Sequence, residues 1–166
     1  MKSYVLFLPI IFIIHDMEEI VGFEKFFKKN SWVFEKFPRI TSAYKNFKTD
    51  AFALAVYEEF IPFFGVAILA YFFQGKILNA IWFGLMLSLT AHFFIHIAQS
   101  IYIRKYIPSL ITSLLLLPAS VFILAKTHVF LQFDFLTLIL IALSILGMMA
   151  NLKLAHSLMK RAGGIK

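Results

Sequence analysis

The sequence predicts an all-α integral membrane protein, a bundle of about five transmembrane helices with an interfacial amphipathic segment after the first. The chain has 166 residues, of which 61% are hydrophobic, whereas a soluble domain is about half apolar. The apolar residues also form long runs, several of which reach the ~20 residues needed to cross a bilayer. Backbone surrounded by lipid must satisfy its own hydrogen bonds, and therefore we expect helices.

A single transmembrane domain, residues 1–166, accounts for the length of the chain. We expect its helices at roughly 4–23, 51–73, 77–103, 107–126 and 134–158. The first begins like a signal peptide but lacks a small-residue cleavage site and continues into charged residues, so we expect it to be retained. The segment 25–48 interleaves aromatic and basic residues, a pattern typical of short helices in the headgroup layer.

The positions of lysine and arginine predict how this bundle is oriented in the membrane. The segment 25–48 carries seven of them, whereas the following loops carry Lys76, then Arg104 and Lys105, then Lys126. This alternation follows the positive-inside rule and predicts an N-terminus outside the plasma membrane and a C-terminus in the cytoplasm. The net charge of +7 then reflects attraction to anionic lipid, and we expect no nucleic-acid partner. The chain has no cysteine, which excludes disulfides and thiolate metal sites.

Ionisable residues from three predicted helices fall at one depth. His15, Glu58 and His96 each lie eight residues from the cytoplasmic end of their helix, which is marked by Phe23, Asp50 and Arg104. At ~1.5 Å per residue, each lies about 12 Å inside the membrane. Hydropathy alone does not require these three residues to share a depth. The shared depth therefore indicates a common site in the cytoplasmic half of the bilayer.

Spacing within the helices supports such a site. His15, Glu18 and Glu19 follow one another at i, i+3 and i+4 and so share a helix face. His92 and His96 lie one turn apart on a second face. We expect Asp16 to point off the first face, toward solvent or the interface. His156, close to the cytoplasmic surface, is expected to extend toward the headgroups.

Two further carboxylates, Glu58 and Glu59, are adjacent and therefore about 100° apart on the second helix. Pro62 removes the hydrogen bond that the Glu58 carbonyl would accept, which predicts a kink there. We expect one of these glutamates to bind a metal and the other to relay protons, with Glu58 as the catalytic candidate.

A divalent metal ion explains why membrane helices carry these groups. A charged side chain near the bilayer centre costs at least ~2.5–3.5 kcal/mol, and the helices that carry the acids contain no lysine or arginine. Carboxylates and imidazoles together are ligands for Zn, Fe and Mn. We expect one or two ions, of Zn or alternatively Fe. The predicted metal ligands are His15, Glu18, Glu19, Glu59, His92 and His96.

The same motifs resemble those of the HXXEE family of small bacterial integral membrane proteins. The sequence HDMEE at 15–19 matches the motif that names this family, and His92 and His96 match its HxxxH motif. A middle motif of Asn-Glu with a later proline corresponds to Glu58–Glu59 and Pro62, without the asparagine. The resemblance covers about residues 10–100. It implies a metal site embedded in the membrane and supplies no reaction.

These features favour a metal-dependent membrane enzyme, specifically a hydrolase that uses metal-activated water on a lipid-like or lipid-linked substrate at the cytoplasmic leaflet. The segment 25–48 would act as a lid or bind anionic head groups. A di-iron oxidoreductase is an alternative, because carboxylates and imidazoles are about equal in number. An ion- or proton-coupled transporter and a non-catalytic structural protein also remain open. The apolar outer halves of the helices disfavour the transporter.

Overall fold

The structure, a computed structural model, describes residues 1–163, so the last three residues of the predicted domain lie outside the described residues. Within 1–163 the chain is helical and contains no strand. The long helices are α2 (Phe7–Lys29), α5 (Thr49–Phe72), α6 (Lys76–Ile103), α7 (Leu110–Thr127) and α8 (Phe135–Ala162). The shorter ones are α1 (Lys2–Val5), α3 (Val33–Lys36), α4 (Pro38–Thr41) and the 3-10 turns η1 (Ser42–Tyr44) and η2 (His128–Phe130).

Each predicted helix has a counterpart among the long helices, with ends shifted by a few residues. The first is interrupted at Leu6, between α1 and α2, and α2 continues to Lys29, beyond the predicted end. Pro62 lies inside α5 without ending it. The segment after α2 forms the short helices α3 and α4, as its aromatic and basic pattern predicts.

Four helices are long and apolar enough to cross a membrane: α5, α6, α7 together with η2, and α8. Helix α2 is not among the four, because four acidic residues lie within its first 18 positions. Only 22% of the apolar stretch of α7 and 11% of that of α8 is buried. Their outer faces expose Leu115, Phe122, Leu138 and Leu146. A continuous apolar surface of this kind indicates a membrane protein.

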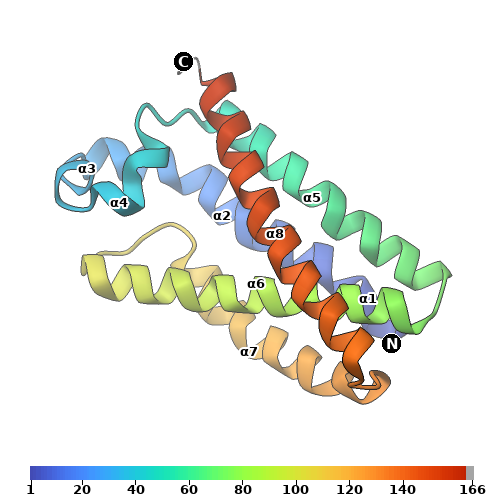
Figure 1. Ribbon diagram of the computed structural model, residues 1–166. Coiled ribbons are helices and arrows are strands. Elements are labelled where there is room, and N and C mark those ends of the chain that lie inside the picture. Colours follow the sequence, from blue (N-terminus) through green and yellow to red (C-terminus); the bar gives the residue numbers. More distant parts are fainter. Residues whose placement is uncertain (164–166) are drawn as a thin grey trace.

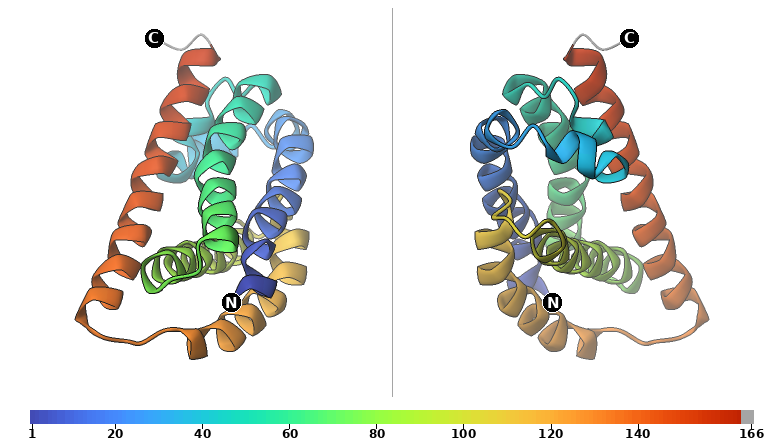
Figure 2. Two further views of the ribbon diagram at one scale, coloured as in Figure 1. Left: turned by 90° about the vertical axis from the view of Figure 1, so that its right-hand side faces the viewer. Right: turned by 90° about the vertical axis from the view of Figure 1, so that its left-hand side faces the viewer.

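Helices α5 and α8 lie close together near the C-terminus and separate toward the other end, whereas α2 and α6 separate toward the end that carries α3 and α4 (Figure 1). Helix α6 is central: it packs against α2, α5, α7 and α8, and Figure 2 shows it end-on between α8 and α2. Helices α3 and α4 lie near the ends of α2 and α6 (Figure 1). We call the end at which α3 and α4 lie the wide end of the bundle.

Close packing fixes α6 against its neighbours. A Cβ atom on Gly84 would lie 2.7 Å from Ser144 Cβ and 2.9 Å from the Ile141 carbonyl oxygen, so α6 and α8 approach closely there. Small residues permit such approaches between membrane helices. On another side, the buried Trp82 donates a 2.8 Å hydrogen bond from Nε1 to the Val5 carbonyl. This bond joins α6 to α1.

Candidate metal centre

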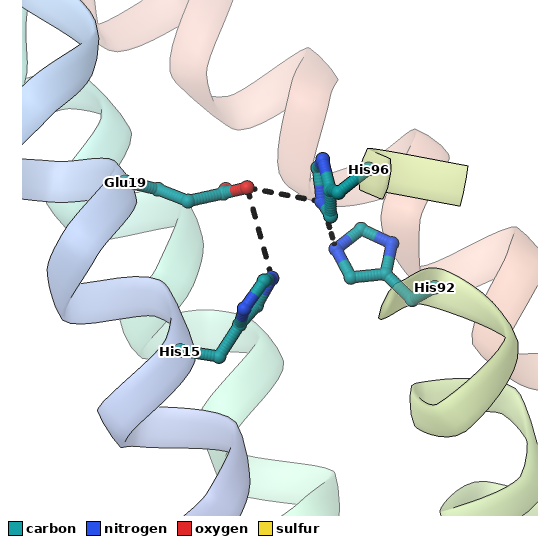
Figure 3. Close-up of side chains that lie close together, drawn as sticks. All are labelled: His15, Glu19, His92 and His96. Atoms are coloured by element: carbon teal, nitrogen blue, oxygen red, sulfur yellow. Dashed lines mark hydrogen bonds and ion pairs between the residues drawn. The ribbon is translucent and has the colours of Figure 1, made fainter. Parts of the chain in front are cut away.

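Helices α2 and α6 bring two pairs of side chains together: His15 and Glu19 from α2, and His92 and His96 from α6 (Figure 3). Within each pair the residues are one turn apart, so both side chains point toward the other helix. One ligand atom from each of the four residues lies within 4.8 Å of all the others. His15, Glu19 and His96 are buried, and His92 is half-buried. We call these four residues the His/Glu cluster.

The spacing of the donor atoms fits one divalent ion. Glu19 Oε1 lies 3.0 Å from His96 Nε2 and 3.8 Å from His15 Nε2. His96 Nε2 lies 2.7 Å from His92 Nε2. Metal–nitrogen bonds of about 2.0–2.1 Å in a tetrahedral site set neighbouring donors about 3.3 Å apart. These three separations bracket this value, and the other pairs of donor atoms lie within 4.8 Å. Three imidazoles with one carboxylate form a donor set suited to Zn and other transition metals.

Several of these donor atoms have no hydrogen-bond partner. His15 Nε2 and Glu19 Oε1 are buried and unpartnered, since the 3.0 Å contact between Glu19 and His96 is not aligned as a hydrogen bond. A buried polar group left unsatisfied costs about 1–3 kcal/mol. Two imidazole nitrogens at 2.7 Å also repel unless a proton or a cation lies between their lone pairs. A bound cation would satisfy all of these atoms together.

Hydrogen bonds outside the His/Glu cluster hold His15 in the form that a metal requires. Its Nδ1 lies 3.0 Å from Thr112 Oγ1 on α7. The Thr112 hydroxyl donates its single hydrogen to Glu18 Oε2 at 2.6 Å, so it accepts the bond from the protonated Nδ1 of His15. In a neutral imidazole this leaves the Nε2 lone pair free to face the cluster. Metal-binding histidines almost always have such a second partner.

Glu18 itself does not join the cluster, although we predicted it as a ligand. Its carboxylate accepts bonds from the backbone N–H of Thr112 at 2.7 Å and of Ile111 at 3.3 Å. Ser109, with a φ of 107°, begins this turn into α7. A carboxylate is favourable at these free N–H groups at a helix start. Glu18 therefore caps α7, which packs on the side of α2 that its i+3 position faces.

Tyr106 completes the surroundings of Glu18 from the loop between α6 and α7. Its hydroxyl donates to Glu18 Oε1 at 2.6 Å. Burial, together with this hydrogen bond, raises the pKa of Tyr106 to about 12. The hydroxyl therefore remains a donor at neutral pH, and Glu18 remains an acceptor in all of its contacts.

The two glutamates of α5 also lie outside the His/Glu cluster. Glu59, predicted as a ligand, is buried, has one unpartnered oxygen and lines a cavity beside His92. Glu58, predicted as the catalytic group, is half-buried and accepts a 3.4 Å hydrogen bond from Asn151 of α8. Their adjacent positions, about 100° apart, turn the two carboxylates toward different neighbours.

Asp16 is buried, with only 4% of its surface exposed, and the expectation that it faces solvent or the interface is wrong. Helices α2 and α5 run antiparallel (Figure 1), and the rings of Phe12 and Phe63 stack between them at 4.6 Å. Asp16 follows Phe12 by one turn and Glu59 precedes Phe63 by one turn, so the two carboxylates lie opposite each other. None of the ion pairs within residues 1–163 joins Asp16 or Glu59 to a lysine or arginine.

Two cavities meet at the His/Glu cluster. The first, of about 250 Å³, contacts Asp16, Glu59 and His92 and is otherwise lined almost wholly by apolar side chains. The second, of about 400 Å³, contacts His92 and His96 and extends under residues 39–44 at the wide end. Both cavities share three lining residues: His92, Ile95 and Leu152. We call them the apolar cavity and the headgroup-side cavity.

His156 lines the headgroup-side cavity instead of extending freely to the surface. It is half-buried on α8, and its Nε2 lies 3.3 Å from the hydroxyl of Tyr44. The sequence shows only that His156 is near the end of its helix. It gives no signal that the segment after α2 folds back over this residue.

A family model described as a protein of unknown function with HXXEE motif matches residues 6–123. The chain belongs to this family. The match confirms the resemblance and extends it into α7, which supplies the Thr112 partner of His15. In this HXXEE protein the motif divides between two tasks: its histidine and last glutamate join the cluster, and its first glutamate caps α7. Searches among curated proteins and solved structures found no match.

Proposed function

We propose that this HXXEE protein is a metal-dependent enzyme of the bacterial plasma membrane, a hydrolase that acts on a lipid-like substrate at the cytoplasmic leaflet. One observation carries the proposal. The buried and unpartnered atoms His15 Nε2 and Glu19 Oε1 converge with the imidazoles of His92 and His96 at the wall between two cavities. A purely structural cluster would need no cavity on either side.

Five helices cross the membrane in this proposal, with the N-terminus outside and the C-terminus in the cytoplasm. Helix α2 is included because its acids at 16, 18 and 19 face other helices and need no lipid contact. The ends of α2, α6 and α8 lie toward the wide end (Figure 1), and each is followed by or contains basic residues. The positive-inside rule assigns such an end to the cytoplasm.

Zn is the ion that the donor set favours, and His15, Glu19, His92 and His96 would hold it. A divalent ion held there would lower the pKa of a coordinated water toward neutrality, which is the chemistry of hydrolytic metal sites. His92 is the half-buried member and borders both cavities, so water and substrate reach the cluster beside it. One compact group of four donors favours one ion over a di-iron pair.

Glu59 takes the proton-relay role that the sequence suggested for Glu58. It is buried, has an unpartnered oxygen and lines the apolar cavity, which His92 also lines. Asp16 lies opposite and lines the same cavity, and one buried oxygen of each carboxylate has no hydrogen-bond partner. Such a pair accepts a proton from the attacking water and returns it to the leaving oxygen.

Metal content tests this proposal directly. Protein purified in a neutral detergent should contain close to one Zn per chain by plasma mass spectrometry. His96→Ala should lose the metal, because His96 contacts both Glu19 and His92. His156→Ala is the matched control: it removes a histidine that lies outside the cluster and should keep the metal.

Two results would contradict the proposal. Folded wild-type protein without metal would favour proton transport or a structural role for the cluster. Two irons per chain would favour the di-iron oxidoreductase.

A further inference from the structure

We infer that the substrate is an amphiphile with an anionic head group, a phosphate or a carboxylate, whose head lies beside Arg39 and whose chain enters the apolar cavity. This inference rests on the proposed function and adds the charge and the orientation of its substrate. Two observations support it: one cavity has a mostly apolar lining whereas the other includes Arg39, and both cavities border His92.

Arg39 supplies the charge for an anionic head. Among the residues that line the two cavities, Arg39 is the single lysine or arginine. Within residues 1–163 its guanidinium forms no ion pair and no hydrogen bond. A guanidinium binds phosphate or carboxylate through two parallel hydrogen bonds, so a free one at a cavity is suited to an anion.

The element that carries Arg39 is packed in place. Arg39 belongs to α4, whose Thr41 hydroxyl donates to the Phe37 carbonyl at 3.0 Å and whose Thr41 side chain is buried. Phe37, directly before α4, packs on Tyr102 of α6 with ring centroids 5.2 Å apart. The guanidinium therefore starts from a fixed backbone at the rim of the headgroup-side cavity.

Polar groups near Arg39 complete a site for a head group. Gln99, Tyr44 and His156 line the same cavity, and each offers a hydrogen-bond donor or acceptor. Deeper in the molecule, Asp16 and Glu59 are carboxylates of the apolar cavity. They repel an anion, whereas Arg39 attracts one, so the charges orient the head toward the wide end.

The apolar cavity offers a space for the hydrocarbon chain of the amphiphile. The apolar cavity is lined by Phe12, Phe63, Leu89, Ile145 and Met148. Because His92, Ile95 and Leu152 border both cavities, a molecule that occupies both passes His92. The bond between chain and head then lies beside the His/Glu cluster. With a phosphate head, the water oxygen bonds to phosphorus, the P–O bond to the chain breaks and the chain oxygen takes the proton. With a carboxylate head joined to the chain through an ester, the water oxygen bonds to the acyl carbon, the acyl C–O bond breaks and the alcohol oxygen takes the proton.

A binding experiment on the full chain tests the inference. Native mass spectrometry would compare dodecyl phosphate, dodecanoate and the neutral dodecyl maltoside as probes of the wild-type protein. Arg39→Gln should weaken binding of the anionic probes about tenfold or more, since it removes charge-assisted hydrogen bonds. Lys36→Gln is the matched control: it removes a positive charge from the same segment, outside both cavities, and should leave binding unchanged.

Arg39-dependent binding of either anion supports the inference, and the preferred anion identifies the head group as phosphate or carboxylate. Equal binding of all three probes overturns it, as does an equal loss in the Arg39 and Lys36 variants. The metal content of each sample separates this inference from the proposed function. Arg39→Gln should keep its metal, so loss of anion binding at full metal content concerns the head group alone.

Discussion

Neighbouring residues of one short motif serve different parts of this molecule. Glu19 enters the His/Glu cluster, whereas Glu18 binds the start of α7 and, through Thr112, fixes the proton of His15 on Nδ1. Both glutamates share a helix face with His15, so the sequence predicted both as ligands. The difference arises because α7 packs against one side of that face and α6 against the other.

Glu18→Gln should weaken Zn binding about tenfold to a hundredfold. An amide nitrogen in place of Oε2 can no longer accept from the Thr112 hydroxyl. The hydroxyl is then free to donate to His15 Nδ1, which would move the imidazole proton to Nε2, the atom that faces the cluster. Competition with a chelator would measure the affinity. Glu58→Gln, an equal change outside the His/Glu cluster, should keep wild-type affinity. Equal affinity in Glu18→Gln and wild type would show that Thr112 does not orient His15.

At the level of helices, composition located the elements but not their contacts. The apolar runs predicted α5, α6, α7 and α8 to within a few residues, because lipid-crossing length and hydropathy are properties of each helix alone. The close approach of α6 and α8 at Gly84 was not predicted. A single glycine in the sequence of a membrane helix does not show whether another helix packs against it.

Gly84→Ala should destabilise the protein by about 1–3 kcal/mol, since the added methyl meets the Ile141 backbone and α8 must shift. Gly147→Ala in α8 provides the control, because nothing lies within 4 Å of a Cβ there. The control should be neutral or more stable by up to about 1 kcal/mol. Thermal unfolding in detergent would compare the two, and equal stability would show that α6 and α8 can separate without cost.

For the whole molecule, the sequence predicted the helical bundle and the shared depth of His15 and His96, but not the arrangement of helices around α2. That arrangement determines the surroundings of the two glutamates of α5. Glu59 lines the apolar cavity, whereas Glu58 accepts a hydrogen bond from Asn151. It also buries Asp16, which the sequence assigned to solvent or the interface. Helical spacing shows which residues share a face. It does not show how many helices surround that face.

The orientation of the bundle can be tested with single cysteines, since the chain has none of its own. Val129→Cys, in the exposed turn η2, should react with a membrane-impermeant maleimide on intact cells. Lys45→Cys, in the segment before α5, should react only after the membrane is permeabilised. The reverse pattern of labelling would invert the topology, and the proposed site would then open to the outside.

The contact between His15 and Thr112 spans 97 positions of the chain, and this separation has a consequence during synthesis. At about 5–20 residues per second, α7 leaves the ribosome about 5–20 seconds after α2. Throughout that interval Glu18 lacks its partner Thr112, and for most of it Glu19 lacks its partner His96. If α2 crosses the membrane as proposed, it is made first but is stably held there only when α6 and α7 arrive. In the proposed topology, the order in which the helices are synthesised therefore differs from the order in which they become stably inserted.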